Sequence, residues 1–332
     1  MNTTDRDLSL AQDGGFNWVK QHFEWRNIER DGKGQFLWDE PDRIVNAISQ
    51  RGLQMVVQVD NQPKWASSKV IYPASSPPDR LLDWTDFLVA VATRYEGRIH
   101  AYEIWDGPNL SSSWGGPPSP TAYADLLKAS YRSLKSADPG AVVVSAGLAP
   151  TTTVSADAMP DVDFVQALYE AGAKGSFDVL GVSAVGFKSS PCMDPGEVAA
   201  RPELTNSDPS SLEAKRVYAF RHVEDVRAIM VREGDSGTPI GILRADWTTD
   251  LRPQSNSHWQ MVTPREQAED LVGAFGWARL HWAPWLSFLV VGTFADPGWT
   301  PYDEGYWRRI TNPDGSHRLA YDALQAVLAP AP

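Results

Sequence analysis

Two short segments of the sequence place an aspartate just beyond a mainly apolar run. Asp106 follows Tyr102-Glu103-Ile104-Trp105, and Asp246 follows Ile242-Leu243-Arg244-Ala245. Carboxyl groups at the ends of parallel strands can face each other and work as an acid and a base. The alternative role for either aspartate is an ion pair with Arg244, which would neutralise its charge.

The elements that must position these residues follow from the hydrophobic pattern. Short β-branched runs alternate with amphipathic segments, a pattern typical of parallel βα units. We predict seven strands, at Phe16 to Phe23, Leu53 to Asp60, Ile99 to Trp105, Ala141 to Ala146, Phe177 to Ala184, Pro239 to Ala245 and Trp285 to Phe294. We predict eight helices, at Asp5 to Gln12, Glu40 to Gln50, Trp84 to Tyr95, Pro120 to Ser136, Val162 to Ala171, Ser211 to Glu233, Pro264 to His281 and Tyr321 to Val327.

This alternation predicts an α/β fold of the TIM-type (β/α) barrel class, with residues 1–332 as a single domain. The first predicted element is a helix, so a closed eightfold barrel would need one more strand before Asp5. We therefore expect the first strand to be missing and the barrel to be open at one seam. The unpaired edge near residues 16–23 would favour self-association through that seam.

The segment Ala101-Tyr102-Glu103-Ile104-Trp105-Asp106-Gly107-Pro108-Asn109-Leu110 resembles the acid/base strand of clan A glycoside hydrolases, especially family 39 and family 5 barrels. In those families the motif ends in Trp-Asn-Glu-Pro-Asn. The resemblance implies that Trp105 and Asn109 keep sugar-binding positions. It places Asp106 where the family has the asparagine that holds the sugar 2-hydroxyl, and Gly107 where it has the acid/base glutamate.

The segment Ile242-Leu243-Arg244-Ala245-Asp246-Trp247 resembles the nucleophile strand of the same group. The resemblance places Arg244 at the nucleophile and Trp247 among the substrate-binding residues. A retaining glycosidase needs two carboxyl groups about 5 to 5.5 Å apart. Glycine supplies no carboxyl group, and a permanent guanidinium cation would repel an oxocarbenium-like transition state.

Other segments carry the resemblance over most of the chain, including Phe16-Asn17-Trp18-Val19-Lys20 and Ala320-Tyr321-Asp322-Ala323-Leu324. The sequence also has 14 tryptophans, and flat aromatic rings stack on pyranose rings. The remaining candidates for sugar contacts are polar or aromatic residues near predicted strand ends: Lys20, His22, Trp25, Gln58 and Trp65.

Composition excludes several other functions. The net charge of −12 and the isoelectric point near 5.0 disfavour binding to nucleic acid or to anionic membranes. No apolar run approaches the length of a membrane span, and residues 1–5 lack an export signal, although related glycosidases are often secreted. Because the histidines lack metal-ligand spacing and no Gly-rich phosphate loop occurs, we expect no metal or other cofactor. Cys192 is the single cysteine.

These observations favour a catalytically impaired, glycoside hydrolase-like protein that binds an oligosaccharide or polysaccharide in the barrel cleft. One alternative is an active O-glycosyl hydrolase that uses Asp106 and Asp246 as rewired carboxylates. Another is a structural or interaction protein without a ligand.

Overall fold

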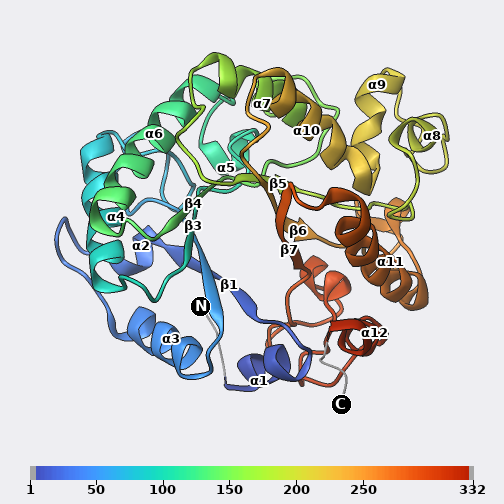
Figure 1. Ribbon diagram of the computed structural model, residues 1–332, viewed down its shortest axis with the longest axis horizontal. Coiled ribbons are helices and arrows are strands. Elements are labelled where there is room, and N and C mark those ends of the chain that lie inside the picture. The colour runs from blue at the N-terminus through green and yellow to red at the C-terminus, as the bar shows by residue number, and fades with distance from the viewer. Residues whose placement is uncertain (1–4, 329–332) are drawn as a thin grey trace. The chain divides into compact units, whose positions relative to one another are not determined.

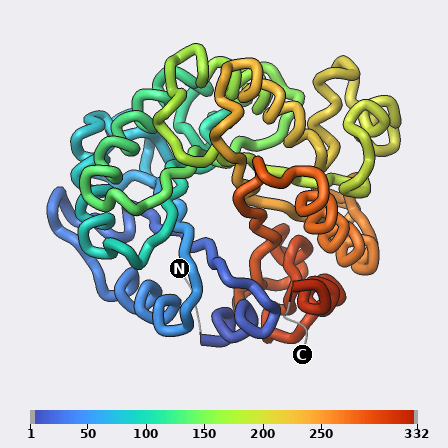
Figure 2. The backbone as a smooth tube through the Cα atoms, in the orientation of Figure 1, coloured from blue at the N-terminus to red at the C-terminus, as the bar shows by residue number. Residues whose placement is uncertain are grey.

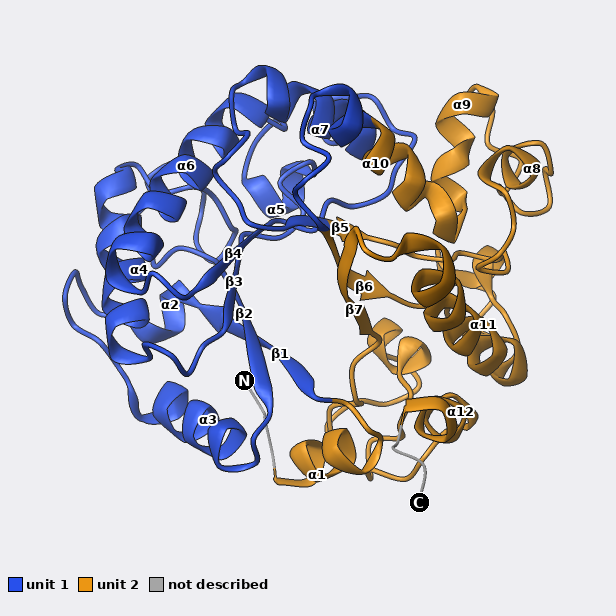
Figure 3. Cartoon of the chain, in the orientation of Figure 1, with its two compact units in different colours: residues 1, 17–181, 229–239 blue, residues 2–16, 182–228, 240–332 orange. Residues whose placement is uncertain are grey.

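The computed structural model describes residues 5–328, which form two compact units (Figure 3). Of these residues, unit 1 comprises 17–181 and 229–239, and unit 2 comprises 5–16, 182–228 and 240–328. The chain passes from one unit to the other within β5 (Leu180–Ser183) and α10 (Val223–Arg232). The assignment of residues 1–332 to a single domain stays a prediction.

Unit 1 contains a four-stranded parallel sheet in the order β1-β2-β3-β4. Its strands are β1 (Trp18–Glu24), β2 (Gln54–Asp60), β3 (Ala101–Ile104) and β4 (Val142–Ser145). Its helices are α2 (Trp25–Ile28), α3 (Asp39–Gln50), α4 (Leu81–Arg94), α5 (Ser111–Trp114), α6 (Pro120–Ala137) and α7 (Asp161–Glu170). Figure 1 shows α3, α4 and α6 along the same side of this sheet. The helices therefore cover one face of the strands.

Local sequence accounts for where α6 begins and how it packs. The Ser119 side chain accepts a hydrogen bond from the backbone N–H of Ala122, and Pro120 occupies the first turn, where no N–H donor is needed. On the buried side, the indole N–H of Trp84 in α4 donates to the Ser130 hydroxyl at 2.8 Å. A buried ring with a satisfied N–H thus joins α4 to α6.

Unit 2 contains β6 (Ile240–Ala245) and β7 (Leu286–Val291), which are parallel neighbours in the sheet order β5-β6-β7. Its helices are α1 (Asp5–Asp13), α8 (Pro195–Ala199), α9 (Leu212–Lys215), α11 (Pro264–Trp277) and α12 (Leu319–Leu328). The 3₁₀ segments are η1 (Arg216–Tyr218), η2 (Phe220–His222), η3 (His258–Gln260) and η5 (Glu304–Arg308), and the π-helical turn is η4 (Ala278–Trp282).

Glycine lets β6 and β7 lie close together. A Cβ built on Gly241 would lie 2.3 Å from the Phe288 ring of β7. Only a residue without a side chain leaves room for that ring. The same region carries register irregularities between the two strands, the first of them between Ile240 and Gly241.

The α/β fold with parallel strands is confirmed, and all seven predicted strands are present among residues 5–328. The expectation that the first strand is missing concerns the residues before Asp5, which lie outside the described range, so the missing strand and the open seam stay predictions. One predicted helix, Ser211 to Glu233, is instead α9, two 3₁₀ turns and α10, because Ala219 has extended backbone angles (φ −98°, ψ 141°). The helix predicted over Pro264 to His281 changes from α11 to the π-helical turn after Trp277.

Candidate functional site

Strands β1, β2 and β3 place a group of polar side chains on one face of the unit 1 sheet. The register pairs Lys20 with Val56, His22 with Gln58, and Gln58 with Glu103. Because strand side chains alternate between faces, these residues share one face, whereas apolar residues such as Val57 fill the helix-covered face. The polar side chains are therefore gathered by register rather than by proximity in sequence.

Lys20 and Glu103 form an ion pair on this face. The Lys20 Nζ lies 2.5 Å from Glu103 Oε2, and the Glu103 side chain is completely buried. Neither Glu103 oxygen has a hydrogen bond of ordinary geometry within residues 5–328. Burial raises the pKa of Glu103 to about 7; the charges of Asp106 and Asp60 add to the rise, and Lys20 opposes it. Glu103 is thus poised to change its protonation near neutral pH, but it has no access to solvent.

His22 and Asp60 form a second pair, nearer the ends of the strands. His22 Nε2 lies 2.5 Å from Asp60 Oδ1, and the Gln58 amide donates to Asp60 Oδ2 at 2.8 Å. Partial burial lowers the pKa of His22, but the hydrogen bond and charge of Asp60 outweigh this effect, and the net pKa is raised. The His22 side chain is 40% exposed. It therefore presents an oriented imidazole that can exchange hydrogen bonds with a ligand.

At position 107, where the sequence resemblance predicts that glycine replaces the acid/base glutamate, the backbone has an unusual conformation. Trp105 and Gly107 both have positive φ angles, of 71° and 57°. The Gly107 N–H donates to the Gly147 carbonyl at 3.0 Å, and a Cβ at Gly107 would lie 3.2 Å from Ser113 Oγ. Asp106 is exposed. This turn is built around glycine, and a glutamate at position 107 would be strained.

We predict that Gly107→Ala lowers the free energy of unfolding by about 1–2 kcal/mol, the cost of a left-handed backbone for a residue with a Cβ. Gly107→Asn should cost less, because asparagine tolerates this conformation better. Urea unfolding of both variants would test this, with Gly116→Ala as the control, since a Cβ at Gly116 meets nothing within 4 Å and φ there is not in the left-handed range. Equal losses for Gly107→Ala and Gly116→Ala would contradict the prediction.

Arg244, which the sequence resemblance predicts to replace the nucleophile, is paired with the buried Asp246. The Arg244 Nε donates to Asp246 Oδ2 at 2.6 Å, and the Arg308 Nη1 donates to Asp246 Oδ1 at 2.7 Å. Burial acts to raise the pKa of Asp246, but Arg244 and Arg308 outweigh it, so the pKa is lowered. Both carboxylate oxygens therefore hold guanidinium groups, an arrangement unsuited to donating a proton.

Several predicted sugar contacts make their main contacts with protein atoms instead. The indole N–H groups of Trp25, Trp105 and Trp247 donate to Glu29 Oε2, the Ser113 carbonyl and the Ser189 carbonyl, and all three rings are buried. Buried Asn109 donates to the carbonyls of Ala149 and Met159 and accepts from the Ala149 N–H. Trp65 is half-buried and donates to the Glu29 carbonyl. Sugar contacts by these five residues stay predictions.

Three residues of these clusters, Glu103, Asp60 and Arg308, were missed as site residues from the sequence. Asp60 ends a predicted strand two residues after Gln58, so period-two alternation could have placed the two on one face. Arg308 lies 62 residues beyond Asp246, at the end of the 3₁₀ segment η5. No sequence signal connects them, because their contact depends on the packing of unit 2.

No group of three or more His, Cys, Asp or Glu side chains in the described part of the chain is placed to hold a metal ion. Likewise, none of the helices within residues 5–328 has the length and apolar character needed to cross a membrane. Cys192 is exposed.

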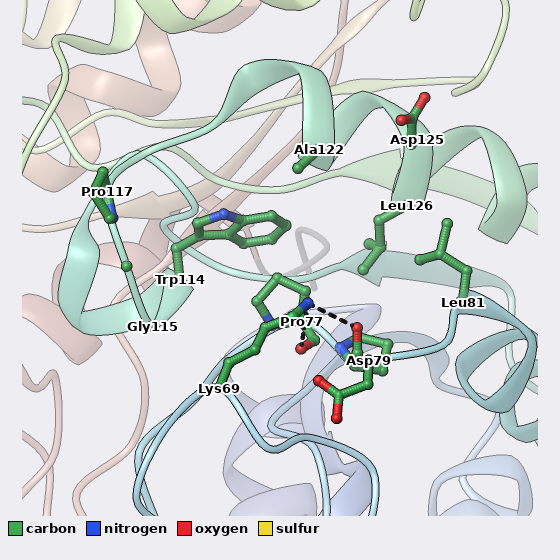
Figure 4. Close-up of a pocket in the computed structure, with 12 residues that line it drawn as sticks. Lys69, Pro77, Asp79, Leu81, Trp114, Gly115, Pro117, Ala122, Asp125 and Leu126 are labelled. Atoms are coloured by element: carbon green, nitrogen blue, oxygen red, sulfur yellow. Dashed lines mark hydrogen bonds between the residues drawn. The ribbon is translucent and has the colours of Figure 1, made fainter.

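A pocket of about 360 Å³ lies elsewhere on unit 1. It is lined by Lys69, Pro77, Pro78, Asp79, Leu81, Trp114, Gly115, Gly116, Pro117, Ala122, Asp125 and Leu126. Figure 4 shows the Trp114 indole between the loop that carries Pro77 and the helix α6 that carries Ala122 and Leu126. None of the residues selected from the sequence lines this pocket, so it is separate from the polar face of β1–β3.

Comparison with known proteins finds matches in structure only. No protein-family model matches the sequence, and none of the curated proteins matches it significantly. The chain is similar in structure to a family 39 glycoside hydrolase from Bacteroides cellulosilyticus WH2, with a TM-score of 0.72 and 16% identity over 97% of this chain and 60% of that one. It is also similar to a monomeric β-xylosidase from Caulobacter crescentus CB15, with a TM-score of 0.67 and 16% identity. The match covers 99% of this chain and 66% of the β-xylosidase.

A third similar structure is xylanase 10B from Thermotoga maritima, with a TM-score of 0.61 and 15% identity, covering 99% of this chain and 90% of that one. The chain thus spans less than two thirds of the family 39 hydrolase and of the β-xylosidase. At these identities the likeness concerns the fold. The chain has the α/β fold of the TIM-barrel glycoside hydrolases of families 39 and 10.

Proposed function

We propose that this chain binds carbohydrate and does not hydrolyse it by the retaining mechanism. The observation that carries the proposal is the state of the two positions that correspond to the family's catalytic glutamates. Gly107 offers only backbone, in a left-handed turn, and Arg244 is bonded to a buried aspartate. Each of the two residues is held by its surroundings: the Gly107 N–H donates to the Gly147 carbonyl, and Arg244 donates to Asp246.

The chemistry of glycoside hydrolysis makes these changes severe. The reaction needs one carboxyl group to protonate the leaving oxygen and a second to attack the anomeric carbon. Asp246 cannot serve as the proton donor, because Arg244 and Arg308 hold its pKa below the ordinary value. Glu103 has a raised pKa, but its side chain is fully buried. Asp106 is exposed, yet a single exposed carboxylate does not make an opposed pair.

The polar face of β1 and β2 supports the binding half of the proposal. His22 and Gln58 carry donors, Asp60 carries acceptors, and the three are already joined by hydrogen bonds. Sugar hydroxyl groups both donate and accept, so they match such preoriented groups. Because the histidine is anchored by a buried carboxylate, little side-chain entropy is lost when a sugar binds.

We expect isothermal titration calorimetry with a panel of xylo-, gluco- and galacto-oligosaccharides to show binding by at least one member, and aryl glycosides to remain intact. His22→Ala should weaken that binding roughly tenfold, the value of one to two hydrogen bonds. His317→Ala is the matched control, because His317 is 39% exposed and also pairs with an aspartate, at 2.9 Å.

Two results would contradict the proposal. Brisk cleavage of an aryl glycoside that is lost in Asp246→Ala would establish the rewired carboxylates as a working catalytic pair. Absence of binding across the whole panel would remove the carbohydrate half of the proposal and favour an interaction protein.

A further inference from the structure

Four arginines are grouped in unit 2 around the position of the missing nucleophile. Arg244 lies on β6, Arg308 ends the 3₁₀ segment η5, Arg309 follows it, and Arg318 precedes α12. We call these four residues the arginine cluster. Arg244 and Arg308 share Asp246, and Arg318 Nη1 donates to the carbonyls of Tyr306 and Arg309.

Positive charge exceeds negative charge in this cluster. Asp246 is shared by Arg244 and Arg308, while Glu304 lies 3.8 Å from Arg308 and is 60% exposed. Burial, reinforced by the three neighbouring guanidinium groups, lowers the pKa of Arg309 to about 10, which leaves it charged at neutral pH. A local excess of cations is unexpected in a chain whose net charge is −12. A bound anion would balance this excess of positive charge.

Hydrogen-bonding capacity in the cluster is also incomplete. Arg309 Nε and Arg318 Nη2 are buried and have no hydrogen-bond partner within residues 5–328. An unsatisfied buried donor is costly, more so on a charged group. The guanidinium groups are meanwhile held in place by aromatic rings, Arg309 at 4.5 Å from Trp299 and Arg318 at 4.3 Å from Tyr306. Arg318 Nε donates to Asn312 Oδ1, so one part of this guanidinium group is bonded while Nη2 is left without an acceptor within residues 5–328. Two fixed donors without acceptors favour a ligand that carries oxygen atoms.

Within the cluster Arg244 is exposed, whereas Arg308 is buried and Arg309 and Arg318 are partly buried. The Arg244 side chain is 51% exposed although its Nε is held by Asp246. A guanidinium in this state keeps a defined orientation and still faces solvent. Planar guanidinium groups match the geometry of carboxylates and sulfates, in contrast to the point charge of lysine.

We propose that the arginine cluster binds the anionic group of an acidic carbohydrate, the carboxylate of a uronic acid or a sulfate ester. This inference rests on the proposed carbohydrate binding and names the class of sugar. The cation that replaces the nucleophile repels an oxocarbenium-like transition state, and the same charge attracts an acidic sugar. The remainder of the acidic chain repels such ligands, so the cluster also fixes where they bind.

The experiment compares matched ligands that differ in charge. Trigalacturonate, glucuronoxylan oligosaccharides and heparin disaccharides would be titrated calorimetrically against their methyl-esterified or desulfated forms. We expect the charged member of at least one pair to bind 10-fold or more tightly than its neutral partner, a difference typical of a charge-assisted hydrogen bond. Preference for the uronates or for the sulfated sugars identifies the anionic group.

Variants localise the effect. Arg244→Gln and Arg309→Gln should each lose roughly 10- to 100-fold in affinity for the charged ligand and little for its neutral partner. Arg244→Lys should restore only part of the affinity. Arg265→Gln is the control, because Arg265 is 83% exposed and bonded to Glu269 on α11. Thermal melts would establish that each variant is folded at the titration temperature.

The outcomes separate the two proposals. Equal affinity for the charged and neutral members of every pair would overturn the anion site and leave carbohydrate binding intact. An equal loss for Arg244→Gln and Arg265→Gln would also overturn it. Failure to bind any member of any pair would contradict carbohydrate binding itself, together with the anion site that depends on it.

Discussion

Asp246→Asn should lower the free energy of unfolding by about 3–5 kcal/mol, the usual cost of removing one partner from a buried ion pair. Asp246 is 3% exposed and holds Arg244 at 2.6 Å and Arg308 at 2.7 Å. Once its charge is gone, Arg308, which is only 9% exposed, keeps a positive charge with little water around it. The nearest remaining carboxylate, Glu304, is 3.8 Å away and mostly exposed.

Chemical denaturation at pH 7 would measure this loss. Glu269→Gln serves as the control, because its ion pair with Arg265 is exposed on both sides and should contribute below about 1 kcal/mol. The pKa of Asp246 is depressed in the folded state, so its contribution is present above its unfolded pKa of about 3.9 and disappears as the pH falls below that value. A loss for Asp246→Asn no larger than that for Glu269→Gln would show that the arginines are stabilised by other groups.

The second large effect concerns Glu103 and has the opposite dependence on pH. The pKa of about 7 against an ordinary value of 4.5 means that the folded state holds the Glu103 proton more tightly than the unfolded state does. The protein should therefore be most stable below pH 4.5 as far as this group is concerned, and lose stability as the pH rises toward 7. At 1.36 kcal/mol per pH unit, the loss at pH 8 is about 3 kcal/mol.

Glu103→Gln should remove this pH dependence. Between pH 5 and pH 8, the free energy of unfolding of the variant should rise relative to that of the wild type by about 2.5 kcal/mol, as measured at pH 5, 6, 7 and 8. The quantity to compare is the slope of the free energy of unfolding against pH. The absolute value of this free energy also changes in the variant, because the amide loses the ion pair with Lys20. Glu40→Gln is the control, since Glu40 is 46% exposed and pairs with Arg43. Parallel curves for wild type and Glu103→Gln would mean that Glu103 is ionised in the folded protein throughout.

Much of the fold is readable from the sequence because hydrophobic periodicity is a local property. The run Leu53 to Asp60 gives β2 within one residue, and Pro120 gives the start of α6, since proline fits only the first turn. The short helices α2, α5 and α8 were not predicted. Each has four or five residues, too few to show a helical period, and each depends on its surroundings.

The candidate site was predicted less completely, because its side chains come from residues that are far apart in the sequence. The Lys20–Glu103 pair joins residues 83 positions apart through the register of three strands, and no local pattern reveals it. The aromatic residues show a second limit of prediction from the sequence. The abundance of tryptophan indicated sugar platforms, whereas Trp25 is buried and packs against Trp84, Phe87 and the half-buried Trp65. Composition reports how many rings there are and not which of them face solvent.

Because α1 pairs with α12 in unit 2, the first helix cannot complete its contacts until the last helix has been synthesised. Figure 2 shows the blue segment of α1 beside the red segment of α12. The Tyr321 hydroxyl donates to the Leu10 carbonyl at 2.8 Å across 311 positions, and Gln325 donates to the Asp13 carbonyl. At a translation rate of about 5–20 residues per second, α1 waits roughly 15–60 s on the ribosome before its partner helix is made. Leu8 and Leu10, buried in the finished protein, are without α12 during that interval. Nascent chains of this protein should accordingly depend on holdase chaperones until translation passes Gln325.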